Sequence, residues 1–108
     1  MSEARDEFCR AIDAGNVMVA KATLAGVVSA DESMYTDTDP NFGNATKHLV
    51  DWLMQCRCIE NVEFSSGIMK SLPPLKMLTL STKPPGPARI FHLKLRLGPH
   101  MEVHSFEG

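Results

Sequence analysis

Residues 88–106 constrain the fold most, because apolar and polar residues alternate along them. Apolar residues occupy the odd positions from 91 to 97, and polar or charged residues occupy the even ones. Side chains of a β-strand point to opposite faces with a period of two, so the pattern predicts a half-buried strand. The sequence Gly-Pro-His at 98–100 is typical of a turn, and the alternation then resumes. We therefore predict a β-hairpin with the pairs Leu97 with Met101, Leu95 with Val103, Arg96 with Glu102 and Lys94 with His104.

Helical periodicity dominates the first half of the chain. Ser2 can cap a first helix, and the next residues bring apolar side chains to one stripe before Gly15-Asn16 ends it. Residues 17–29 predict a second, short helix. Asn44 can cap a third helix that extends to about residue 58 and carries Trp52 on its apolar face.

After the third helix the period of two returns. It covers residues 61–65, then 75–82, and then the two strands of the terminal hairpin. Helices first and four consecutive strands afterwards are typical of an α+β fold, with N-terminal helices packed on one face of a curved antiparallel sheet. A length of 108 residues fits a single domain, 1–108.

Composition disfavours several partners. The net charge of −2 and the scattered Lys and Arg residues predict no nucleic-acid binding. No apolar run approaches the ~18 residues needed to cross a bilayer, and an acidic N-terminus is unlike a signal peptide. The three cysteines lack a zinc or redox spacing, which predicts free thiols and a cytoplasmic protein. His92, His100 and His104 lack further ligands at a recognisable spacing, so we expect no metal and no cofactor.

The order of these elements resembles a known superfamily. The motifs are FCRAIDAGN followed by a short helix, a Tyr-Thr-Asp loop at 35–37, NATKHLVDWL, and closing strands that end in EVHSF. Together they are similar to nuclear transport factor 2-like proteins, which include ketosteroid isomerase-like and polyketide cyclase-like members. The resemblance implies a cone-shaped, cystatin-like α+β barrel, in which a bent sheet wraps a long helix around an apolar cavity. It does not imply an activity, because one fold hosts many functions.

Two sets of residues are candidates for a site. A carboxylate beside a phenol in a buried position can act as base and oxyanion donor, which makes Tyr35, Asp37 and His92 candidates for catalysis. In the simpler interpretation, the Asp residues hydrogen-bond their own loop. An apolar ligand cavity is expected to be bordered by Tyr35, Phe42, Trp52, Met77 and Phe91.

The alternation of odd and even residues along the strands also predicts an interface on the outer face of the sheet. If even residues of 75–82 pair with even residues of the hairpin, an apolar patch with a charged rim results, and a two-fold dimer would cover it. The patch would consist of Leu78, Leu80, Ile90, His92, His104 and Phe106. A change of register by one residue would instead move Leu78 and Leu80 to the core.

Three functions remain open at this point. We expect a homodimeric protein that binds a small apolar or aromatic molecule in an internal cavity. The first alternative is an isomerase-, dehydratase- or cyclase-type enzyme that uses Asp37 with Tyr35 or His92. The second is a structural homo-oligomeric interaction module whose sheet surface is the working part.

Overall fold

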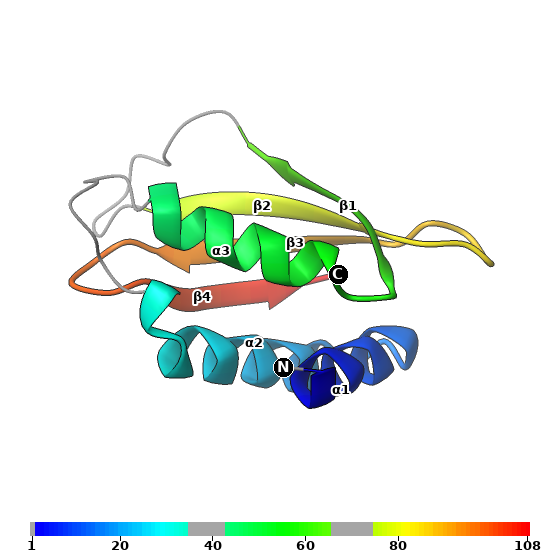
Figure 1. Cartoon of the computed structure of the whole chain (residues 1–108). Coiled ribbons are helices and arrows are strands. Elements are labelled where there is room, and N and C mark those ends of the chain that lie inside the picture. The colour runs from blue at the N-terminus through cyan, green and yellow to red at the C-terminus, as the bar shows by residue number, and fades with distance from the viewer. Residues whose placement is uncertain (1, 35–42, 66–74) are drawn as a thin grey trace.

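The computed structural model describes residues 2–34, 43–65 and 75–108 of the chain. Helices precede strands, as Figure 1 shows. The elements are α1 (Ser2–Asp13), α2 (Val17–Ala30), the short 3-10 helix η1 (Glu32–Met34), α3 (Gly43–Met54), β1 (Ile59–Phe64), β2 (Leu75–Thr82), β3 (Ile90–Arg96) and β4 (Glu102–Glu107). The predicted α+β class, with N-terminal helices on an antiparallel sheet, is confirmed.

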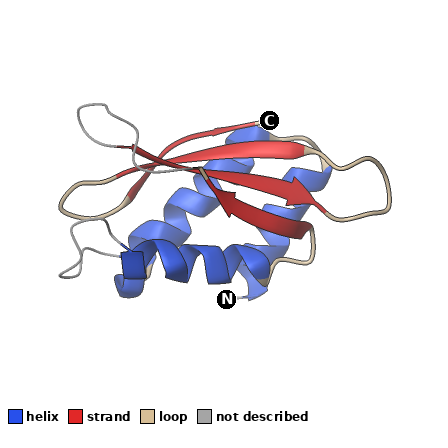
Figure 2. Ribbon diagram, turned by 90° about the horizontal axis from the view of Figure 1, so that it is seen from above, coloured by secondary structure: helices blue, strands red, loops and turns tan. Residues whose placement is uncertain are grey.

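The four strands form one antiparallel sheet in the order β1-β2-β3-β4. Each strand therefore pairs with its neighbour in sequence, which is the predicted meander. In the described residues the outer strands β1 and β4 do not pair with each other, so the sheet is open and not closed into a barrel. Figure 2 shows the twisted strands with the helices lying across one side of the sheet.

Helix ends follow local chemistry. Gly15 adopts a φ of +69°, a conformation that favours glycine, where the chain leaves α1. The side chain of Asn16 then accepts a hydrogen bond from the N–H of Val19 at 3.2 Å and caps α2. The third helix ends at Met54 and not near residue 58, because a tight turn follows in which the N–H of Ile59 bonds the carbonyl of Cys56 at 3.2 Å.

The core lies between the helices and one face of the sheet. The ring of Phe8 on α1 contacts both Trp52 on α3 and Phe106 on β4, with ring centres 5.8 and 6.0 Å apart. Phe106 also stacks on Phe91 of β3 at 5.3 Å. Leu93 of β3 is fully buried next to them. One aromatic cluster thus joins α1, α3 and the last two strands, and aromatic contacts of this kind add to the free energy gained by burial.

The predicted register between β2 and β3 is wrong by one residue. Leu78 pairs with Leu93 and Leu80 with Phe91, so Leu78 and Leu80 lie in the core and not on the outer face. Where the loop closes in this register, the hydroxyl oxygen of Thr82 accepts a hydrogen bond from the N–H of Arg89 at 2.9 Å, and the N–H of Thr82 donates to the carbonyl of Arg89 at 3.1 Å. Even residues of β2 therefore lie opposite odd residues of β3.

A β-bulge alters the terminal hairpin. The predicted pairs Leu95 with Val103 and Arg96 with Glu102 are confirmed, but Lys94 pairs with Ser105 instead of His104. Between these pairs β3 advances by one residue, from Leu95 to Lys94, whereas β4 advances by two, from Val103 to Ser105. His104 is therefore the extra residue of the bulge. Beyond it the faces are exchanged, so Phe106 is buried and the prediction that it lies on the outer face is wrong.

None of the helices in the described ranges combines the length and the apolar character needed to cross a membrane.

Candidate functional site

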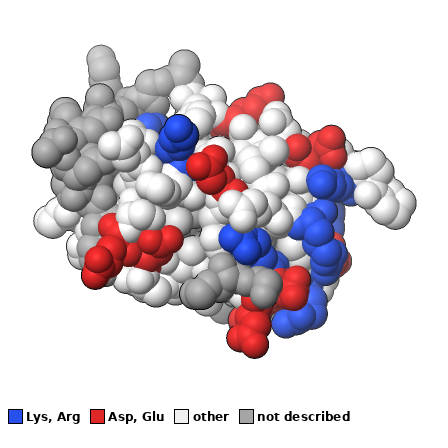
Figure 3. Space-filling view, viewed as in Figure 1, with Lys and Arg blue, Asp and Glu red and all other residues white. Residues whose placement is uncertain are grey.

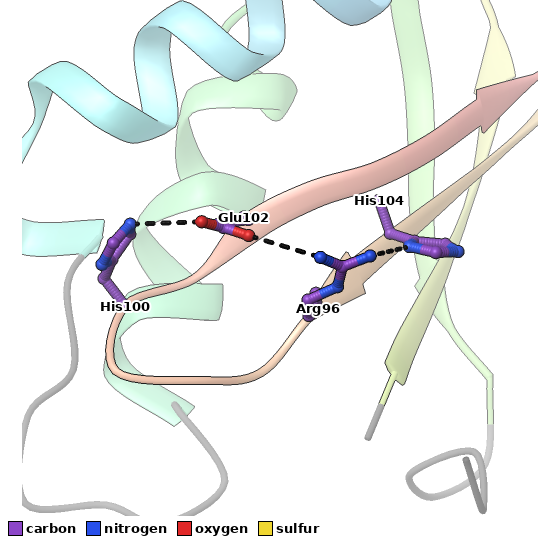
Figure 4. Close-up of polar contacts among 4 residues, drawn as sticks. All are labelled: Arg96, His100, Glu102 and His104. Carbon is purple, nitrogen blue, oxygen red and sulfur yellow. Dashed lines mark hydrogen bonds and ion pairs between the residues drawn. The ribbon is translucent and has the colours of Figure 1, made fainter. Parts of the chain in front are cut away.

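The outer face of the β3–β4 hairpin carries a row of polar side chains (Figure 4). Glu102 lies between His100 and Arg96, with its carboxylate oxygens 3.4 Å from Nε2 of His100 and 3.8 Å from Nη1 of Arg96. Nη2 of Arg96 is 3.0 Å from Nδ1 of His104. A guanidinium can only donate, so Nδ1 of His104 accepts this hydrogen bond. The row is about half exposed, and ion pairs at such positions contribute little to stability.

His92 lies on this outer face, away from the core. Its Nδ1 is 3.4 Å from Oγ1 of Thr79 on β2. The sheet therefore separates His92 from the aromatic core in which Trp52 lies. The other two catalytic candidates, Tyr35 and Asp37, lie outside the described residues.

Of the five residues predicted to border a cavity, the structure describes Trp52, Met77 and Phe91, and these three do not share one cavity. Trp52 and Phe91 belong to the aromatic core, where each is more than nine-tenths buried. Met77 pairs with Lys94 on the outer face, so the prediction that it borders the same cavity is wrong. Tyr35 and Phe42 lie outside the described residues. Trp52 does line a pocket, which lies between the helices.

That pocket opens where α1, α2, η1 and α3 meet, and it has a volume of about 340 Å³. Apolar groups form most of its wall, including the Trp52 ring and the side chain of Val27. The guanidinium of Arg5 lies over the ring of Trp52, 5.9 Å from the centre of the ring. The full lining is Ala4, Val27, Ala30, Asp31, Glu32 and Trp52. We refer to it as the Trp52 pocket.

Two carboxylates form one side of the Trp52 pocket. Asp31 accepts hydrogen bonds from the backbone N–H and the hydroxyl of Ser33, at 3.0 and 2.6 Å. These bonds, helped by the charge of His48, hold the pKa of Asp31 below its ordinary value, so Asp31 is ionised at neutral pH. Glu32 is the second acid. Figure 3 shows a group of Asp and Glu side chains over the C-terminal end of α2.

A second pocket, of about 480 Å³, lies at the opposite end of the molecule beside the β2–β3 loop. It is lined by three cationic side chains, Arg57, Lys83 and Arg89, and by Asp13. Asp13 forms an ion pair with Arg57 at 3.3 Å. Figure 3 shows Lys and Arg side chains gathered at this end of the molecule. The two pockets therefore differ in the sign of their charge.

The three cysteines are free, as predicted, and all are buried. The thiol of Cys56 donates a hydrogen bond to the backbone carbonyl of Trp52 at 3.6 Å. Burial raises the pKa of Cys56 from 9.0 to about 12 and raises that of Cys58 as well. Buried protonated thiols are poor nucleophiles. Among the described residues, His, Cys, Asp and Glu side chains form no group of three or more that could hold a metal ion.

Sequence reasoning missed Asp31 and Glu32. The only available signal was their position directly after an apolar helix, where acidic residues are common for reasons of capping and solubility. Their role as pocket walls depends on how α1 and α3 pack against the end of α2, which is a tertiary feature. The place of Trp52 on the apolar face of a helix predicted its deep packing, which the structure shows, but not its position at this pocket.

The fold and the sites define an open-faced α+β protein, with a packed aromatic core, a polar outer sheet face and one Trp-walled pocket among its helices. Comparisons with models of protein families, with curated proteins and with solved structures find no match. The similarity to nuclear transport factor 2-like proteins therefore stays a prediction.

Proposed function

We propose that the protein binds a small molecule with an apolar or aromatic body and a positive charge, in the Trp52 pocket. The observation that carries the proposal is the pairing of an indole wall with the carboxylates of Asp31 and Glu32 around one opening. A volume of about 340 Å³ is within the range of small-molecule sites, at its lower end. This is the small-molecule function expected from the sequence, with the ligand in a surface pocket between helices instead of an enclosed cavity.

Charge and apolar surface select the ligand together. An aromatic or alkyl body gains free energy by leaving water for the wall of Val27, Ala30 and Trp52. An ammonium group is attracted by the face of an indole and by ionised carboxylates. Carboxylate ligands would be repelled by the same two acids, so we expect discrimination by sign of charge.

The chain contains a single Trp, so its fluorescence reports on the pocket that Trp52 lines. We would titrate the protein with phenethylammonium and follow Trp52 fluorescence. Saturable quenching or a spectral shift is expected, because the ligand would bring a charged group next to the part of the indole that lines the pocket. Phenylpropionate, with a similar body and the opposite charge, is expected to leave Trp52 fluorescence unchanged even if it binds the basic pocket.

Two charge-reversing substitutions distinguish binding in the Trp52 pocket from a non-specific effect of the charge of the protein. Glu32→Lys should weaken phenethylammonium binding by about tenfold, since it replaces an attractive charge by a repulsive one. Glu60→Lys is the matched control, because Glu60 is an exposed acid on β1 outside the pocket lining. The proposal is overturned if neither probe changes Trp52 fluorescence, or if both Lys variants weaken binding equally.

A further inference from the structure

α2 carries apolar residues on its exposed side as well as on its buried side, and Lys21 and Ser29 are the polar residues exposed among them. Its sequence, VMVAKATLAGVVSA, contains one charged residue. Ala20, Leu24 and Val28 face the core, whereas Met18 is 80% exposed and Val19 40% exposed. A helix that is apolar on all sides is typically covered on all sides. In the ranges that the structure describes, nothing covers the outer side of α2.

Gly26 lies in the middle of this exposed side. A methyl group added at Gly26 would meet no atom within 4 Å, so no neighbour within the chain requires a glycine there. Glycine inside a helix costs about 1 kcal/mol relative to alanine. The missing side chain leaves a hole in the surface of α2, into which a side chain of another molecule can pack.

Met18 is the side chain that matches the hole. Met18, Ala22 and Gly26 are spaced by four residues and therefore form one ridge along α2. A two-fold axis at Ala22, with the helices antiparallel, makes Ala22 face its own copy. The same axis places Met18 of each copy over Gly26 of the other, because both residues lie four positions from Ala22. We infer that the outer side of α2 docks on α2 of a second copy of this chain in this arrangement.

Charges on α1 agree with that occupant. α1 packs beside α2, and the turn at 14–16 makes the two helices antiparallel (Figure 1). The two-fold axis therefore also runs α1 antiparallel to α1 of the partner. The exposed side of α1 carries the acids Glu3, Asp6 and Glu7 in its first half and Arg10 in its second half. Two further charges of α1 have partners within the chain, because Arg5 lies over the Trp52 ring and Asp13, at the end of the helix, forms an ion pair with Arg57. Arg10 of each copy then faces the acidic half of the partner's α1, which is complementary.

The acidic residues of α1 also disfavour binding of α2 to a lipid membrane, the other surface that an exposed apolar helix could contact. An anionic lipid surface attracts basic residues, and the rim of the groove between α1 and α2 carries Glu7. The outer sheet face is a poorer interface than the sequence predicted, since Leu78, Leu80 and Phe106 are in the core. Ile90, 47% exposed, is the large exposed apolar residue that remains there among those described. The α2 interface is independent of ligand binding in the Trp52 pocket.

Sedimentation equilibrium of the full chain tests the inference, and the wild type is expected to be a dimer at micromolar concentration. Gly26→Leu fills the hole, and Met18→Lys removes the side chain that enters it. If each contact is worth about tenfold in affinity, two-fold symmetry doubles the loss, and either variant should raise the dimer dissociation constant about 100-fold. Arg10→Glu should raise it by a smaller factor and make it less sensitive to salt.

Gly26→Ala and two controls distinguish docking from misfolding. Gly26→Ala is expected to weaken the dimer while it raises the urea midpoint of the monomer, since alanine is the better helix former and has open space. A merely structural glycine would lower stability instead. Ile90→Lys is the matched control for Met18→Lys, because it places the same charge at an exposed apolar residue on the sheet and should leave the dimer intact.

A cysteine at the axis gives an independent readout. Ala22→Cys should form a disulfide-linked dimer under mild oxidation by molecular oxygen, in which two thiols are oxidised to one disulfide and oxygen is reduced to peroxide. Ala25→Cys, exposed on the same helix but away from the axis, should link far more slowly. The inference is overturned if the wild type is monomeric at high micromolar concentration. It is also overturned if Ile90→Lys dissociates the dimer, or if Ala22→Cys and Ala25→Cys link equally.

Discussion

Three buried thiols lie where α1 meets the turn between α3 and β1, and their burial makes the protein sensitive to alkali. A thiol that is harder to ionise in the folded state stabilises the fold below its unfolded pKa of 9.0. That contribution is lost as the pH rises toward the folded pKa of about 12. Over this interval we expect Cys56 alone to lower the free energy of unfolding by up to about 1.4 kcal/mol per pH unit.

Urea unfolding followed by Trp52 fluorescence at several pH values would measure this slope. Cys56→Ala is expected to be less stable at neutral pH, because it leaves a small cavity, but to lose less stability as the pH rises. Parallel slopes for the wild type and Cys56→Ala would contradict the prediction.

Single residues also show what the sequence could and could not predict about the site. Trp52 was predicted to border an internal cavity, and it instead lines a surface pocket between helices. Met77 was assigned to the same cavity by its size and flexibility, but strand parity places it on the other side of the sheet. Asp31 and Glu32 have no periodic signal, and only the packing of three helices gives them a role. Composition identifies apolar residues, but the face on which each lies depends on register.

Among the elements, β2 depends most on a contact outside its own sequence. Its span, Leu75–Thr82, was predicted from alternation, but its register was not, because both faces carry apolar residues. We expect the hydroxyl of Thr82 to favour this register, because it accepts a hydrogen bond from the N–H of Arg89 where the loop closes. Local alternation predicts that a strand exists, whereas the loop that closes it decides which side is buried.

Thr82→Val should therefore destabilise the hairpin. It keeps the shape of the side chain but leaves the N–H of Arg89 without its acceptor, which costs about 1–2 kcal/mol. The matched control is Thr79→Val on the outer face, where the contact to His92 is long and exposed. We expect a lower urea midpoint for Thr82→Val and almost no change for Thr79→Val. Equal effects would mean that the hydroxyl of Thr82 does not set the register.

For the molecule as a whole, the order of helices and strands was enough to predict the α+β class, but not the open sheet. Closure into a cone depends on how far the outer strands curve toward each other, and no short-range pattern in the sequence encodes that distance. The sheet consequently has two edges, β1 and β4, of which β4 packs beside α2.

Amide hydrogen exchange would test this arrangement directly. β2 and β3 are paired on both sides, so the amides of Leu80 and Leu93 are expected to exchange only on global unfolding. β1 is paired on one side, and its outward amides should exchange much faster. Protection of β1 as strong as that of β3 would require a further strand or a partner along this edge, in disagreement with the open sheet.

Because His104 is the extra residue of a bulge, it can be deleted without changing the pairing of β3 with β4. Removing His104 would leave Leu95 opposite Val103, Lys94 opposite Ser105 and Leu93 opposite Phe106, which are the pairs already present. The shortened strand would be regular, and its loss of free energy would be confined to the contact with Arg96. Removing Lys94 instead would exchange the faces of the residues that follow it and expose part of the core. We expect the first deletion to yield folded protein with a cooperative unfolding transition and the second to yield none, so insertions and deletions in natural variants of this hairpin should cluster at position 104.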